Sequence, residues 1–412
     1  MSNIEHRLTN KGLDVGVLQF WMQHTANDTD DSGITVNPFA APYLDQWFAD
    51  NQTAWQAIVT GSRQPYCYRQ YISADPNSTL LLEVLLPHLN EMRNLAKMGK
   101  WKIQFSLLRG DSTAALEHCM TVIRLGRHVQ DAPVLIEQLG GIAISSLGHQ
   151  QLLQIMSDVN LSEAQLGQLN QHLTTLYPDG YPLVNPEHEK LIFYDTVQHV
   201  FTNGGLGGGH IVPEQLSIIS HSRWQPISRW GTDYEWLKDV KMGLLHARRN
   251  DTVTQANRLY RKTAEIQTLT PFQIRSTQRN IDALLTALSP HRYALIHYLM
   301  PALDRCFELG YRIKTEHAGV LTVLALQRWH KQRGTYPAQL DELVTTGLLR
   351  NVPQDPFGQG SLMYKLKENS FTLYSVGTNF EDDEGRPGVT RDGRFKRWTD
   401  TGDAMIWPVI SD

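Results

Sequence analysis

The chain has few cysteines, no long apolar run near its start, and little excess charge. The three cysteines, Cys67, Cys119 and Cys306, are widely spaced and form no C-x-x-C pair, which argues against a disulfide framework or a structural zinc site. Residues 1–20 hold no apolar run of the length that a signal peptide or a membrane span requires. A formal net charge of -4 argues against a nucleic-acid partner, because such proteins usually carry a basic surface.

The composition is that of a folded protein with more than one domain. Hydrophobic residues make up 41% of the 412 residues and charged residues 19%, a balance typical of globular chains rather than disordered ones. At about 150 residues per domain, this length predicts two or three domains.

Helical periodicity dominates the first three quarters of the sequence. Within residues 79–156 one apolar face is traced by Leu82, Leu85, Leu86, Leu89, Met92, Leu95 and Met98, as in an amphipathic helix. Gly110 can end one helix and Asp111 can cap the next. No 34-residue period repeats along the chain, so we expect an irregular α-helical bundle over residues 1–315, with a possible sub-boundary near residues 203–232.

Short motifs follow one another in the last hundred residues. An apolar helix (residues 318–329) ends at Gly334 and is followed by Tyr336-Pro337. The run Asp355-Pro356-Phe357-Gly358, two short alternating strands, Tyr374-Ser375-Val376-Gly377 and an acidic loop at residues 381–385 come next. This order predicts a small α+β module with a short antiparallel sheet over residues 316–412.

The order of these motifs resembles the C-terminal globular part of the major pseudopilin of type II secretion systems. In that family the loop after Y-S-x-G binds calcium, and the resemblance implies Ser375, Asp382, Asp383 and Asp403 as the calcium ligands. It covers less than a quarter of the chain. Two departures are plain: residues 386–400 enlarge the loop and make it basic, and some three hundred other residues replace the N-terminal membrane helix of the pseudopilin.

The whole chain resembles a group of large, mostly uncharacterised proteins of planctomycete-type bacteria, in which a helical region precedes such a module. These proteins often have a membrane anchor just before the equivalent of residues 4–8. The resemblance therefore implies an extracytoplasmic or envelope-associated protein near a membrane, whereas the residues themselves are equally consistent with a cytoplasmic one.

The acidic loop is the first candidate site, with two alternatives. Calcium takes six or more oxygen ligands and often combines carboxylates with carbonyl oxygens, which Asp382, Asp383 and Asp403 with Ser375 would supply. Alternatively, the carboxylates form a solvated turn that nearby arginines neutralise, the candidates being Arg386, Arg391, Arg394 and Arg397.

A second candidate site lies on an expected helix between residues 186 and 201. His188, Asp195 and His199 are spaced by seven and four residues, which places them on one helix face near the glycine loop at residues 204–209. Such a face predicts a hydrolase-like site with an acid and a base. No His-Glu-x-x-His motif and no G-x-S-x-G motif supports it.

The sequence therefore favours a non-enzymatic interaction or scaffold protein that binds a protein partner and has an envelope or secretion role. Its acidic loop is stabilised by calcium or by arginine. The alternative is an enzyme that uses the His188, Asp195 and His199 face.

Overall fold

The structure of this chain is a computed structural model that describes residues 41–73, 80–212, 215, 243–300 and 302–410. It is mainly helical. In chain order, the helices are α3 (Ala41–Asp50), α4 (Gln52–Ser62), α5 (Pro87–Leu108), α6 (Ser112–Gln130), α7 (Leu135–Asp158), α8 (Glu163–Leu176), α9 (Glu189–Val200), α12 (Arg249–Gln267), α13 (Pro271–Thr277), α14 (Ile281–Thr286), α15 (Ala294–Leu299), α16 (Leu303–Arg333) and α17 (Asp341–Thr345).

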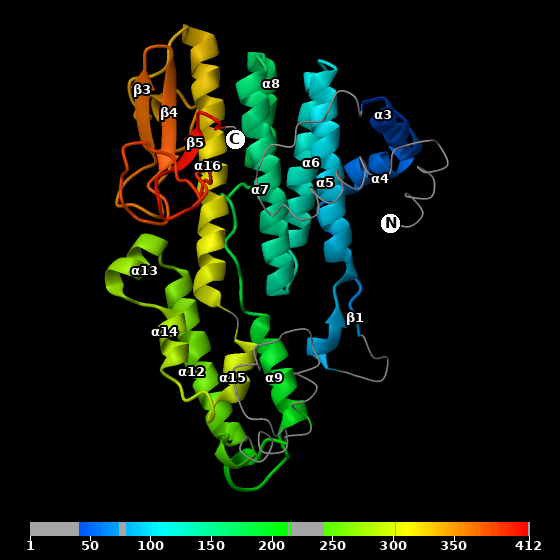
Figure 1. The fold of residues 1–412 in the computed structure, drawn as a ribbon, viewed down its shortest axis with the longest axis vertical. Coiled ribbons are helices and arrows are strands. Elements are labelled where there is room, and N and C mark those ends of the chain that lie inside the picture. Colours follow the sequence, from blue (N-terminus) through cyan, green and yellow to red (C-terminus); the bar gives the residue numbers. More distant parts are fainter. Residues whose placement is uncertain (1–40, 74–79, 213–214, 216–242, 301, 411–412) are drawn as a thin grey trace.

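Helices α5, α6 and α7 pack side by side, and α7 and α8 pack against α16 (Figure 1). Glycines bring α6 and α7 into backbone contact. A Cβ built on Gly141 would lie 2.3 Å from the backbone nitrogen of Gln130, and one on Gly126 would lie 2.6 Å from that of Ser145. Since any side chain there would push the helices apart, this crossing depends on glycine.

Capping residues set several helix ends. The Asp111 side chain accepts a hydrogen bond from the Ala114 backbone at the start of α6. Ser162 and Gln165 form the reciprocal capping box that opens α8. Both pairs satisfy backbone N–H groups that have no partner within their own helix.

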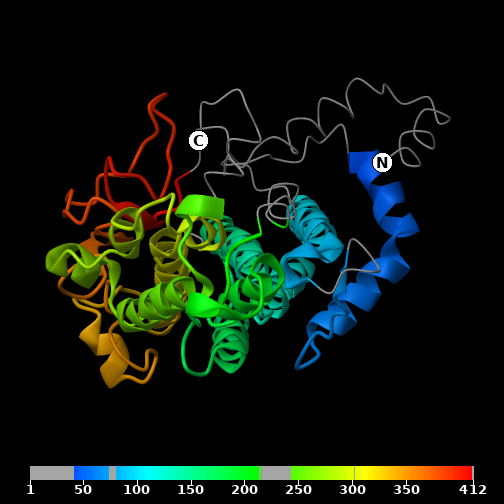
Figure 2. The same ribbon diagram turned by 90° about the horizontal axis from the view of Figure 1, so that it is seen from below.

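A second group of helices, α9, α12, α14 and α15, lies at the opposite end of the molecule from the C-terminal sheet (Figure 1). Figure 2 shows α3 and α4 on the side of the molecule away from that sheet, with α5 to α7 between them. Two short strands, β1 (Ile72–Ser73) and β2 (Val84–Leu85), pair with each other, and the 3-10 helix η2 (Leu81–Glu83) contacts α9. A further 3-10 helix, η3 (Leu206–Gly208), contacts α12.

The C-terminal module, residues 316–410, is built on the second half of α16. Its antiparallel sheet has the order β3 (Met363–Lys367), β4 (Ser370–Ser375), β5 (Ala404–Trp407). Both β4 and β5 pack on α16, where a Cβ on Gly319 would lie only 2.5 Å from Ile406 Cδ1. Helix α13 contacts the C-terminal module through the Phe272 backbone N–H, which donates to the Pro356 carbonyl at 3.1 Å.

The predicted fold class is confirmed: a mainly α chain with a short antiparallel sheet near its C-terminus. Helix α16 runs unbroken through residues 315 and 316 until Gly334, whose φ of 78° ends it. The predicted α-helical domain and the C-terminal module therefore share one helix, and a domain boundary between residues 315 and 316 stays a prediction. The predicted sub-boundary at residues 203–232 lies partly outside the described residues.

Within the part of the chain that the structure describes, no helix has both the length and the apolarity needed to span a membrane.

Candidate functional site

Two sequence motifs of the C-terminal module meet at the buried carboxylate of Asp355. Its Oδ1 accepts hydrogen bonds from the Phe357 N–H at 3.0 Å and from the Ser375 hydroxyl at 2.8 Å, and its Oδ2 accepts one from the Val376 N–H at 2.9 Å. Burial raises the pKa of Asp355, and the three hydrogen bonds oppose that rise. The Asp-Pro-Phe-Gly turn and the Tyr-Ser-Val-Gly strand end thus form one structural unit, and Ser375 belongs to it.

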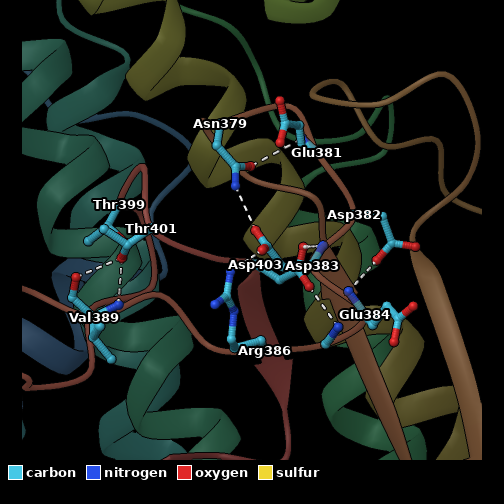
Figure 3. Close-up of polar contacts among 11 residues, drawn as sticks. Asn379, Glu381, Asp382, Asp383, Glu384, Arg386, Val389, Thr399, Thr401 and Asp403 are labelled. Atoms are coloured by element: carbon cyan, nitrogen blue, oxygen red, sulfur yellow. Dashed lines mark hydrogen bonds and ion pairs between the residues drawn. The ribbon is translucent and has the colours of Figure 1, made fainter.

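The acidic loop is organised around Asp403, whose side chain is fully buried. Its Oδ2 accepts a hydrogen bond from the Gly385 N–H at 2.7 Å and its Oδ1 one from the Asp383 N–H at 3.2 Å. The Asp403 N–H donates to the Arg386 carbonyl at 2.8 Å. One residue at the start of β5 therefore fixes the backbone of residues 383–386 (Figure 3).

The other two aspartates of the loop also have protein partners. Asp382 Oδ1 accepts from the Tyr374 hydroxyl and from the Glu384 N–H, each at 2.9 Å. Asp383 lies between Asn379, whose side-chain amide donates at 2.7 Å, and Arg386, with which it forms an ion pair (Figure 3). Of the arginines that were candidates to neutralise the loop, Arg386 thus makes a direct contact with one of its aspartates.

The backbone donors contribute more to this loop than the arginine does. The side chain of Arg386 is 69% exposed, and exposed ion pairs contribute only about 0–1 kcal/mol. Hydrogen bonds from N–H groups to a buried carboxylate are charge-assisted and shielded from water, so each is stronger. The loop is consequently held mainly by Asp403.

Electrostatics in the loop follow from the same contacts. Burial raises the pKa of Asp403 to about 6, the two backbone hydrogen bonds lower it, and the charges of Asp382 and Asp383 add to the rise. The hydrogen bond from Arg386, followed by the one from Asn379, lowers the pKa of Asp383.

The predicted calcium ligands do not converge in this arrangement. Asp382, Asp383 and Asp403 lie in one loop, but the hydroxyl of Ser375 donates to Asp355 instead. Among the described residues, no group of three or more His, Cys, Asp or Glu side chains is placed to hold a metal ion. Calcium would compete with the N–H and O–H donors that these carboxylates already have, and titration tests whether it binds.

The inserted residues 386–400 fold back on the module. The Thr390 N–H donates to the Arg394 carbonyl at 2.8 Å, which closes a small hairpin. Arg397 points inward and lies 3.7 Å from the buried Glu316 carboxylate, which also accepts from the Trp398 indole at 2.7 Å. Part of this basic insertion therefore attaches the module to α16 rather than neutralising the acidic loop.

Of the three predicted catalytic residues, Asp195 and His199 lie on α9 and make structural contacts there. His188 is the residue that precedes the helix and is exposed. The Asp195 carboxylate accepts the Leu81 backbone N–H at 2.7 Å, and His199 Nδ1 lies 2.8 Å from the Asp195 carbonyl oxygen. His199 Nδ1 is 3.9 Å from the nearer Asp195 carboxylate oxygen, too long for a hydrogen bond. The catalytic prediction gains no support from these contacts.

The glycine loop packs closely against its neighbours. A Cβ on Gly207 would lie 2.4 Å from Arg248 Cδ, and one on Gly209 would lie 1.9 Å from the Thr202 carbonyl oxygen. The positive φ angles of Gly207 (73°) and Gly209 (129°) favour glycine for a second reason. These glycines allow the loop to pack closely against the start of α12, which is a local structural reason for their presence.

Two buried polar clusters were not predicted from the sequence. Glu137, in the first turn of α7 and fully buried, accepts from the Tyr71 hydroxyl at 2.8 Å and lies 2.6 Å from His88 Nε2. Burial, then the contact with Glu137, raises the pKa of Tyr71 to about 12. The second cluster is a buried pair, His149 and His317, whose Nε2 and Nδ1 atoms lie 3.1 Å apart.

Neither cluster leaves a local sequence signal. The Glu137 contacts span 49 to 66 residues and the histidine contact spans 168. These side chains are brought together only by tertiary packing, that of α5 and the segment before β1 against α7, and that of α7 against α16.

Comparisons of the chain with models of protein families, with curated proteins and with solved structures found no match.

Proposed function

We propose that this chain is a non-enzymatic interaction protein that binds a protein partner through the exposed face of α9. Its C-terminal acidic loop has a structural role and is held by Asp403, backbone N–H groups and Arg386. The resemblance of the module to the type II secretion pseudopilin supports an envelope- or secretion-associated setting.

The observation that carries this proposal is a pair of exposed leucines at the place of the alternative, hydrolase-like site. Leu191 is 57% exposed and falls between His188 and Asp195 at spacings of three and four residues, on the same helix face. Leu81, whose N–H binds Asp195, is 42% exposed. Leu81 and Leu191 are thus both linked to Asp195, and exposed apolar side chains gathered in one region are costly in water and are a feature of protein interaction sites.

Site-specific crosslinking tests the interaction. A photoreactive phenylalanine analogue replaces Leu191 in the full chain, produced in the cells that naturally make it, and the same analogue at the exposed Gln171 of α8 is the control. We expect one discrete crosslinked species from position 191 that position 171 does not give. Crosslinks that are the same at both positions, or none at position 191, would refute this surface as the binding site.

Calcium titration tests the structural role of the loop. A ligand that binds only the folded state, at a hundred times its Kd, adds about 2.7 kcal/mol to the free energy of unfolding. We expect calcium, magnesium and chelator to give the same unfolding curve. A calcium-specific stabilisation that Asp403→Asn abolishes would establish calcium as the element that holds the loop.

A further inference from the structure

A cavity of about 580 Å³ opens between α13, α14, the first turns of α16 and the C-terminal module. A cavity of this size is in the range that small molecules occupy in proteins, roughly 300–1,000 Å³. Its apolar wall is formed by Ile274, Phe307, Tyr311 and Phe380. Phe380 comes from the segment that leads into the acidic loop, so the cavity joins the helical body to the module.

The cations that line the cavity already have partners. Arg275 donates to the Asn379 carbonyl at 2.5 Å and stacks on the Phe380 ring, 4.7 Å from its centre. Arg305 forms a 2.7 Å ion pair with Glu308. Neither guanidinium therefore needs an anion from a ligand.

Two carboxylates of the lining, Asp282 and Asp304, have no cation. Asp304 uses Oδ2 to accept the Asp282 backbone N–H at 2.9 Å, and its buried Oδ1 has no hydrogen-bond donor. Within the described residues, the Asp282 carboxylate has no hydrogen bond and no ion pair. Burial, and after it the negative charge of Asp304, raises the pKa of Asp282. A positive charge placed between two neighbouring carboxylates stabilises both of them as anions.

We infer that this cavity binds an organic ammonium group, with Asp282 and Asp304 as its counter-charges and the aromatic wall against its hydrocarbon part. The ammonium belongs either to a free alkylamine or to a lysine side chain of a partner. The inference does not rest on the α9 surface, since no residue is shared between the two sites.

Methyl NMR on the full chain tests the inference, with isoleucine methyl groups labelled so that Ile274 reports from the cavity wall. The probes are n-butylammonium and neutral n-butanol, which share the same hydrocarbon chain. A second pair, acetyl-Gly-Lys-Gly-amide and its Nε-acetylated form, distinguishes a lysine side chain from a free amine.

The variants are Asp282→Asn and Asp304→Asn, with Asp341→Asn on α17 as a control outside the cavity. Asparagine keeps the size of the side chain, and its oxygen at position 304 can still accept the N–H of residue 282. Thermal unfolding of each variant shows whether it is folded. We expect n-butylammonium to shift the Ile274 signal, n-butanol to have little effect, and each cavity variant to raise the Kd at least tenfold while Asp341→Asn leaves it unchanged.

Binding of the lysine peptide but not its acetylated form would assign the site to a partner's lysine, and binding of n-butylammonium alone would assign it to a free amine. The inference is overturned if the Ile274 signal does not shift at roughly 50 mM n-butylammonium, a concentration that saturates a site of millimolar Kd. An equal response to n-butanol, or an unchanged Kd in both cavity variants, would also overturn it.

Discussion

The buried histidine pair makes the stability of this protein sensitive to acid. His149 on α7 and His317 on α16 are 0% and 2% exposed, and the rings of Tyr177 and Tyr181 pack around them. Burial, then the nearby charge of Arg397, lowers the pKa of His149 to about 4. Burial and its neighbour His149 lower the pKa of His317 well below its ordinary value.

The sign of the effect follows from these shifts. The unfolded chain binds protons at both histidines near pH 6.5, whereas the folded chain does so only at much lower pH. Between those values the unfolded state binds more protons, so the free energy of unfolding falls as the pH falls. For His149, whose pKa drops from 6.5 to about 4, acidification from pH 7.5 to pH 5 costs about 2 kcal/mol, and the lowered pKa of His317 adds to this cost.

Urea unfolding at pH 7.5, 6 and 5 measures this dependence, with a double variant, His149→Leu with His317→Leu, beside the wild type. The exposed His172→Leu on α8 is the matched control. We expect the double variant to lose at least about 2 kcal/mol less than the wild type between pH 7.5 and pH 5, the amount that His149 alone accounts for. The reasoning is refuted if the double variant and the wild type show the same pH dependence, or if His172→Leu has as large an effect.

Three further predictions follow from close contacts and from Asp403. Gly319→Ala places a Cβ against Ile406 and is expected to lower the free energy of unfolding by about 1–3 kcal/mol. The control Gly360→Ala, whose Cβ meets no atom within 4 Å, should change it little, and equal effects of the two variants in urea unfolding would contradict the packing at Gly319. Gly141→Ala drives a Cβ into the backbone of α6 and should cost about 3 kcal/mol or more; a wild-type melting temperature would show that the helices are not in contact there. The pKa of Asp403 is raised from 3.8 to about 6 in the folded state, so its contribution to stability is present at low pH and is lost as the pH rises through about 6. Asparagine does not titrate, so the free energy of unfolding of Asp403→Asn should fall less than that of the wild type between pH 5 and pH 7. An unchanged slope would argue against burial of this carboxyl group.

Local patterns predicted the local parts of the fold. Leu89, Met92, Leu95 and Met98 lie on α5, Asp111 caps α6 and a glycine ends α16, as predicted. The start of the predicted apolar face was wrong, because Leu82 and Leu85 lie in η2 and β2, before α5 begins at Pro87. Each confirmed feature depends on residues within one or two helical turns of one another, where periodicity and capping rules apply directly.

The candidate sites depended on contacts that no local pattern contains. The sequence predicted an acidic loop that follows the Tyr374 motif, and in the structure the Tyr374 hydroxyl donates to Asp382 in that loop. It did not reveal that Ser375 binds Asp355, twenty residues earlier, nor that the Asp195 carboxylate accepts a backbone N–H from Leu81, 114 residues away. The tertiary structure sets which of several possible partners a polar side chain takes.

The affinity of the full chain for the partner that crosslinks at position 191 tests the proposed interaction most directly. Wild type, Leu191→Asp and Gln171→Asp are compared by calorimetric titration against that purified partner. A charge at the centre of an apolar contact has to be desolvated, so we expect Leu191→Asp to weaken binding at least tenfold, about 1.4 kcal/mol, and Gln171→Asp to bind as the wild type does. Equal affinities for all three proteins would contradict the assignment of the α9 face as the interaction surface.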